Sequence, residues 1–158
     1  SLAQSKLFIK SQVEKMTNFY PNGVSAKTAD FTAAAGYVYL VTDQAGCAIT
    51  LPTPAAGDRI KNINVKAVTS NTTVITSPSG YLLSGYLIVH DAVDMTNSVT
   101  CAFAPDGSDD RVLTLNGTTQ GGGGGDVIEL IGVADGGSAG WWVEGVVQGS
   151  GTLATQFS

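Results

Sequence analysis

The chain has 158 residues, of which 43% are hydrophobic and 13% are charged, against about 25% charged residues in an average soluble protein. One domain is expected at this length, and the apolar content is sufficient for a buried core. Thirteen acidic residues against eight cations give a net charge of −5, which argues against a general nucleic-acid binder, because such proteins are basic.

The charge divides the sequence into a basic arm and an acidic body. Residues 1–28 contain four lysines and one glutamate, a net charge of +3, whereas residues 29–158 contain four cations and twelve acids, a net charge of −8. Apolar residues recur near helical spacing over residues 2–16, which predicts a short helix. Pro21 and Gly23 indicate a turn and linker over residues 18–27. We therefore expect an N-terminal arm over residues 1–27 and a domain over residues 28–158.

From Phe31 onward, short apolar runs rich in Val, Ile, Thr and Tyr alternate with Gly, Pro, Asn and Asp, which is typical of strands and turns. Nine strands are predicted, at residues 36–41, 47–51, 58–67, 73–76, 86–91, 98–104, 112–115, 126–132 and 141–147. No run of ten residues between them keeps a helical period, which argues against crossover helices and a parallel sheet. The pattern predicts an all-β fold, an antiparallel β-sandwich of the jelly-roll type.

The sequence offers little catalytic chemistry. The single histidine, His90, is expected to be a structural or surface residue, because no nucleophile, base and orienting group can be assembled around it. Cys47 and Cys101 lack metal-ligand spacing and are expected to be free thiols in strands. The sequence has no run of 18 apolar residues and no apolar segment long enough for a signal peptide. We expect no enzyme activity, no cofactor and no membrane partner.

Two loops have alternative interpretations. Asp106, Asp109 and Asp110 place three carboxylates in one short loop, and such oxygen ligands suit Ca²⁺. The spacing of an EF-hand is absent, so a solvated turn is preferred to an ion site. The glycine run at residues 121–125 lacks the ending of a phosphate-binding loop and precedes a strand. It predicts a long flexible hairpin loop, ordered only if a neighbouring subunit packs on it.

Aromatic residues are the candidates for a subunit interface. Trp141 and Trp142 are adjacent on a predicted strand, so one indole is expected in the core and the other outside. The outward indole is interpreted as an interface anchor, with a sugar-stacking platform or a lid over a sandwich edge as alternatives. Tyr81 and Tyr86 flank an apolar segment that is interpreted as a second apolar hairpin.

Several short segments resemble virion proteins of bacteriophages. They are residues 48–58 (AITLPTPAAGD), 71–76 (NTTVIT), 126–132 (DVIELIG) and 140–145 (GWWVEG), and residues 28–36 and 151–155 fit as well. Together they look like the β-sandwich head decoration (cement) proteins of tailed phages, and related modules occur in phage tail fibres. The resemblance implies a homotrimer on the outer capsid surface, which clamps neighbouring major capsid subunits against internal pressure.

The expected function is therefore that of a structural virion protein bound to the major capsid protein. The arm is expected to reach the capsid lattice through apolar anchors and through lysines that pair with an acidic surface. These contact residues are Leu2, Lys6, Leu7, Phe8, Ile9, Lys10 and Val13. The alternative function is that of a tail-fibre or spike module, which would bind host-surface glycan through an exposed Trp or Tyr and the acidic loop.

Overall fold

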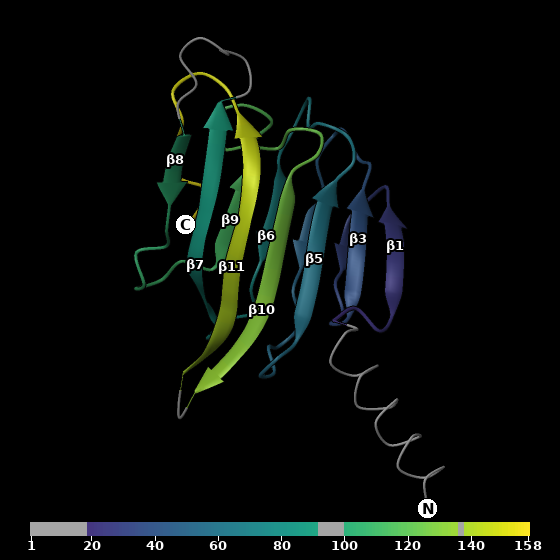
Figure 1. Cartoon of the computed structure of the whole chain (residues 1–158), viewed down its shortest axis with the longest axis vertical. Coiled ribbons are helices and arrows are strands. Elements are labelled where there is room, and N and C mark those ends of the chain that lie inside the picture. Colours follow the sequence, from purple (N-terminus) through teal and green to yellow (C-terminus); the bar gives the residue numbers. More distant parts are fainter. Residues whose placement is uncertain (1–18, 92–99, 136–137) are drawn as a thin grey trace, which may run out of the picture.

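A computed structural model describes residues 19–91, 100–135 and 138–158 as two β-sheets packed face to face (Figure 1). The larger sheet has seven strands, in the spatial order β1 (Gly23–Lys27), β3 (Tyr37–Val41), β5 (Arg59–Asn64), β10 (Val127–Asp135), β11 (Ser138–Gly149), β7 (Leu82–Asp91) and β8 (Thr100–Phe103). The smaller sheet has four strands, in the order β2 (Phe31–Thr32), β4 (Ala48–Thr50), β6 (Thr73–Thr76) and β9 (Val112–Leu115). The described residues contain no helix that could span a bilayer. The predicted all-β sandwich is confirmed.

The first six strands alternate between the two sheets. β1, β3 and β5 are neighbours in the larger sheet, β2, β4 and β6 are neighbours in the smaller one, and all these pairs are parallel. The chain therefore winds as a flattened coil, each turn of which adds one strand to each sheet. β10 then pairs antiparallel with β5 and β11, β9 with β6, and β8 with β7, whereas β11 and β7 are parallel.

The predicted antiparallel pairing is thus wrong for much of the sandwich. Of the nine pairings between described strands, five are parallel and four are antiparallel. Parallel neighbours need a long crossover connection, which is usually a helix, and the sequence has no helical crossover segment. In the four parallel pairs among β1 to β6, a strand of the opposite sheet serves as the crossover, so these pairs form without helices.

All nine predicted strands overlap observed ones, and β6 and β9 match their predicted bounds. β1 and β2 were not predicted. β1 occupies Gly23–Lys27, so the linker interpretation of residues 18–27 is wrong there. At this edge the ammonium of Lys27 lies 5.1 Å from the ring centroid of Phe31 and 5.6 Å from that of Tyr39. The predicted helix over residues 2–16 lies outside the described residues.

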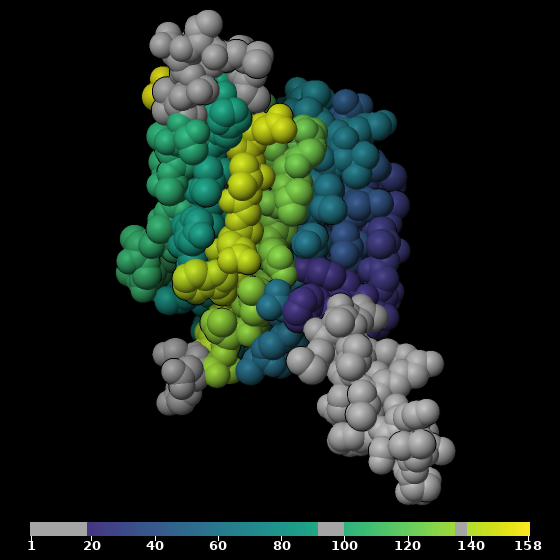
Figure 2. All heavy atoms as spheres, in the orientation of Figure 1, coloured from purple at the N-terminus to yellow at the C-terminus, as the bar shows by residue number. Residues whose placement is uncertain are grey.

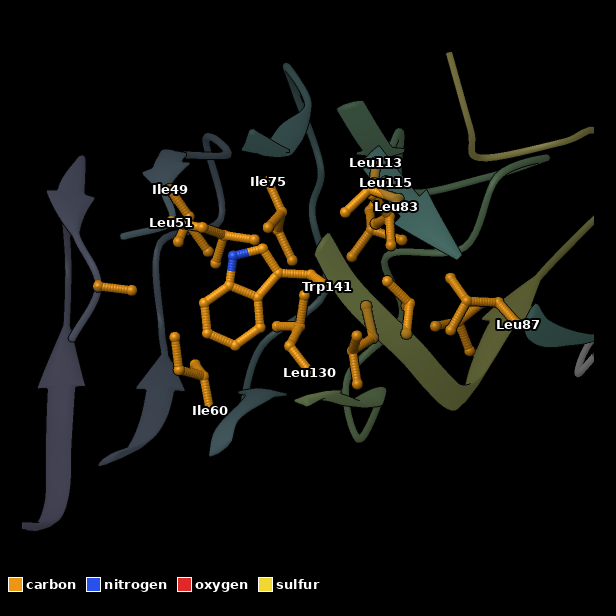
Figure 3. Packing of buried hydrophobic residues seen from close by; sticks show 14 of the residues in the cluster. Ile49, Leu51, Ile60, Ile75, Leu83, Leu87, Leu113, Leu115, Leu130 and Trp141 are labelled. Atoms are coloured by element: carbon orange, nitrogen blue, oxygen red, sulfur yellow. The ribbon is translucent and has the colours of Figure 1, made fainter. Parts of the chain in front are cut away.

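The core lies between the sheets and is organised around Trp141 (Figure 3). Its indole is fully buried, and Nε1–H donates to the carbonyl of Pro52 at 3.1 Å. Buried aliphatic side chains from both sheets belong to the same cluster, including Ile49, Leu51, Ile60, Ile75, Leu83, Leu113, Leu115 and Leu130. Because adjacent residues on a strand face opposite sides, Trp142 faces outward and is 37% exposed. The predicted division of the two indoles is confirmed.

The glycine run at residues 121–125 is held by the chain itself. The buried carboxylate of Asp126 accepts hydrogen bonds from the backbone N–H of Gly122 at 2.7 Å and from that of Gln148 at 2.8 Å. Burial raises the pKa of Asp126 to about 6, and these hydrogen bonds to the carboxylate oppose that rise. The ordering contacts that were expected from a neighbouring subunit therefore come from Asp126.

The two adjacent tryptophans allow a matched test of the packing. Trp141→Phe should lower the free energy of unfolding by about 2 kcal/mol, because it leaves a void and removes the hydrogen bond to Pro52. Trp142→Phe should change it by less than about 0.5 kcal/mol, because that ring lies at the surface. Urea denaturation followed by circular dichroism measures both values. Equal losses would contradict the central place of Trp141 in the core.

Candidate functional site

The smaller sheet covers one side of the seven-stranded sheet, and the opposite side, here called the outer face, is turned to the viewer in Figures 1 and 2. Strand register places its outward residues in rows across the sheet. One row is apolar over six strands: Leu40, Ile63, Val127, Val146, Ile88 and Ala102. Outward positions of a solvated sheet are usually polar. An apolar row on an outer face indicates a surface that another molecule covers.

Most of the exposed apolar side chains gather on this face. Six of the eight large hydrophobic residues that are exposed in the described chain occupy its outward positions: Val24, Tyr86, Val127, Val133, Trp142 and Val146. A seventh, Phe19, packs on the same face, with its ring centroid 4.3 Å from the guanidinium carbon of Arg59. The exposed large hydrophobic side chains of the described chain are therefore concentrated on one side of the molecule.

A second row of outward residues lies two residues along each strand from the apolar row, and it carries charged side chains on the central strands of the sheet. Lys61, Glu129 and Glu144 are neighbours there on β5, β10 and β11. The carboxylate of Glu129 lies 2.5 Å from the guanidinium of Arg59 and 3.9 Å from the ammonium of Lys61. It also accepts a hydrogen bond from the hydroxyl of Tyr20 at 2.8 Å. Burial and this bond raise the pKa of Tyr20, so the phenol stays a donor.

Glu144 is the exception in this row. It lies directly opposite Glu129, and no cation of the described chain lies within ion-pair distance of it. Like charges at directly opposite positions destabilise a sheet. A locally destabilising arrangement of this kind is expected at functional positions, where a partner supplies the compensating group.

A hollow of about 500 Å³ lies over both rows on β5, β10, β11 and β7. Tyr86, Val127 and Val146 give it an apolar floor, and the carboxylates of Glu129 and Glu144 reach it as well. The residue types match a protein segment that combines apolar side chains with lysine or arginine, since such a segment can bury apolar area and neutralise Glu144.

The aromatic candidates divide between this face and the interior. Tyr86, which is 43% exposed, and Trp142 both belong to the outer face. Trp141 is fully buried and cannot contact another subunit. Tyr81 and Tyr86 do not form the expected hairpin, because residues 82–91 make one continuous strand. Tyr81 lies just before that strand, in a turn where its N–H donates to the carbonyl of Pro78 at 3.1 Å.

The three aspartates of the acidic loop are close together, with carboxylate oxygens within 4.8 Å of one another. Asp106 accepts hydrogen bonds from the N–H and the hydroxyl of Ser108 at 2.8 and 2.7 Å, and these bonds lower its pKa. Asp110 accepts one from the N–H of Asp106 at 2.6 Å. The carboxylates of Asp106 and Asp110 therefore cap backbone amides of the loop, and Asp109 lies beside them.

The remaining candidate residues are His90 and the two cysteines. Nδ1 of His90 lies 3.3 Å from the hydroxyl of Thr100 on the neighbouring strand. Cys47 is buried and Cys101 is half-buried, and both are free thiols. Burial raises the pKa of the Cys47 thiol, which disfavours the thiolate.

The predicted contact residues of the arm, from Leu2 to Val13, lie outside the described residues. The described chain begins with Phe19 and Tyr20, whose contacts place them on the outer face. The arm is therefore joined to the molecule at the edge of the candidate site.

Sequence reasoning identified Trp142 and Tyr86 but missed the face to which they belong. One signal was available, because residues 127–133 (VIELIGV) are apolar at most outward and inward positions alike. Such a run indicates a strand that is covered on both faces. No family model matches the chain, and no curated protein or solved structure is significantly similar to it.

The opposed glutamates give a test of the charge arrangement. Glu144→Gln should raise the free energy of unfolding of the isolated protein by about 0.5 kcal/mol, because it removes a repulsion across the β10–β11 pair. Glu129→Gln should lower it by a similar amount, because it weakens the pairing with Arg59. Urea titrations at low ionic strength measure both changes. A loss of stability in Glu144→Gln would show that Glu144 has a favourable partner in the isolated chain.

Proposed function

We propose that this chain is a structural virion protein that decorates the outer capsid surface of a tailed phage as a homotrimer. The single observation that carries the proposal of a protein-binding role is the apolar row across the outer face. Burial of this apolar surface against another protein stabilises the complex by about 25 cal/mol per Å² of apolar surface buried. Trp142 and Tyr86 are the residue types that most often anchor such interfaces.

The step from a protein-binding module to a capsid decoration protein rests on the sequence resemblance. The resembling segments supply the strands of the site itself, since residues 126–132 overlap β10 and residues 140–145 lie in β11. On this proposal the outer face makes contacts between subunits, and the trimer as a whole binds the major capsid protein. The role is structural and needs no catalytic group.

A second candidate function is glycan binding by a tail-fibre or spike module. It is favoured by the hollow, where the exposed ring of Tyr86 lies beside carboxylates and the amide of Gln148. Aromatic rings that stack on sugars and carboxylates or amides that accept and donate hydrogen bonds are common in carbohydrate sites. The two functions predict different stoichiometries on a virion.

The copy number on purified particles of the phage that encodes the chain tests the proposal. Quantitative mass spectrometry should find the protein in numbers comparable with the major capsid protein, and electron microscopy should place it on the outside of the head. A few copies located at the tail would contradict decoration. Binding of the full chain to a glycan array, abolished by Tyr86→Ala, would support the fibre module instead.

A further inference from the structure

We propose that Asn22 is a site of spontaneous deamidation, at which the chain converts this asparagine into aspartate or isoaspartate with water as the other reactant. The sequence contains two Asn-Gly pairs, Asn22-Gly23 and Asn116-Gly117. Such pairs are prone to deamidation, because glycine has no Cβ to hinder attack by its own backbone nitrogen. The inference is independent of the proposed function, since the reaction takes place within a single chain.

The reaction is an intramolecular displacement followed by hydrolysis. The backbone nitrogen of Gly23 attacks Cγ of Asn22, so that a bond between this nitrogen and Cγ forms and the bond between Cγ and Nδ2 breaks. The proton of the Gly23 N–H passes through solvent to the leaving Nδ2, which departs as ammonia. Water then opens the cyclic imide at either of its carbonyl groups, which gives the carboxylate of aspartate or of isoaspartate. No atom is oxidised or reduced.

Asn22 is exposed in the turn that leads into β1. Within the described chain its side chain makes one hydrogen bond, from Nδ2 to the carbonyl of Ala35 at 2.9 Å. The attacking nitrogen, that of Gly23, donates to the carbonyl of Tyr20 at 3.1 Å. A Cβ placed on Gly23 would meet no heavy atom within 4 Å apart from its chain neighbours, so the imide ring has room to form. The side chain and the nitrogen are therefore freed by the loss of two hydrogen bonds at an exposed turn.

The fold protects the second pair, at Asn116. Its Oδ1 accepts hydrogen bonds from two backbone N–H groups of the following turn, at 2.9 and 3.0 Å, and its Nδ2 donates to the hydroxyl of Thr119 at 3.0 Å. The N–H of Gly117 donates to the carbonyl of Gly121 at 2.7 Å. Gly117 also packs closely, since a Cβ there would lie within 3 Å of the carbonyl of Val68. Reaction at Asn116 therefore requires a larger local opening, which is less often populated.

Deamidation would weaken the attachment of β1. A carboxylate oxygen in place of Nδ2 would face the carbonyl oxygen of Ala35, so an attractive contact would become a repulsive one. Isoaspartate would in addition insert a methylene into the main chain of the turn. This turn joins β1, an edge strand that pairs with β3, to Tyr20 and Phe19 on the outer face. The modification would therefore loosen one edge of the outer face irreversibly as the protein ages.

Peptide mass spectrometry of the full-length chain, incubated at mildly alkaline pH, measures both sites in one sample. In the native protein, deamidation at Asn22 should be at least about tenfold faster than at Asn116, because its turn opens more easily. In urea the two rates should agree within about threefold, because neither turn is then formed. Equal native rates, or an Asn22 that stays intact while the unfolded chain reacts, would overturn the proposal. The same ratio of rates in both states would also overturn it, since the fold would then not select the site.

Two variants at the same position complete the experiment. Asn22→Gln keeps the amide on a longer side chain that cyclises far more slowly, so the deamidated form of this peptide should disappear while the rate at Asn116 stays the same. Asn22→Asp reproduces the aspartate product, and it should speed amide hydrogen exchange in β1 at least severalfold while exchange in β9, in the other sheet, is unchanged. Unchanged exchange in β1 would contradict the loosening of this edge, and persistent modification of the peptide in Asn22→Gln would show that another residue reacts.

Discussion

Every strand of the larger sheet carries side chains on two faces, and the smaller sheet covers only one of them. The inner face is closed by a core centred on Trp141, which ties the two sheets together. The outer face has no second layer in the described chain, yet one row of its outward positions is apolar across six strands. Burial of apolar area is the main favourable term in folding and association. The apolar row that no second layer covers therefore links the fold to the proposed assembly.

The charges on the outer face lie where they would give an assembly its register. Glu129 forms an ion pair with Arg59 within its own chain and accepts a hydrogen bond from the hydroxyl of Tyr20. Glu144, directly opposite, is left without a cation in the described chain. Apolar contact supplies affinity without direction, whereas one unpaired carboxylate on an apolar surface disfavours every arrangement that leaves it buried without a partner. Glu144 thus adds specificity to a surface whose apolar contacts supply affinity alone.

Local patterns predicted much of the secondary structure and little of its pairing. The bounds of β6 and β9 follow from short β-branched runs between turn residues, and the adjacent Trp141 and Trp142 follow from the two-residue period of a strand. Pairing depends on where each connection returns, and no local pattern shows that a strand of the other sheet can act as the crossover. β1 was missed because Pro21 and Asn22 lie just before it and Gly23 begins it, and these three residues resemble a linker.

Strand β5 also shows how little local sequence patterns predict about which face of a strand is buried. Alternation separated its residues into two sets, but the buried set contains Asn62 and Asn64, which bond to each other at 3.2 Å, while the set with Ile63 faces out. The outward set contains Arg59 and Lys61 beside Ile63, so both sets mix apolar and polar residues and polarity alone does not decide the orientation. The outer face could be recognised only when the register of several strands was known, because its apolar row takes one residue from each of six strands far apart in the sequence.

The central claim is that protein covers the outer face in the assembled state, and hydroxyl-radical footprinting of Trp142 tests it most directly. The account predicts that oxidation of Trp142 is fast in dilute, dissociated chains and at least several-fold slower in the assembly, while the buried Trp141 is protected in both. An equal rate of Trp142 oxidation in the two states, with Trp141 still protected, would contradict it.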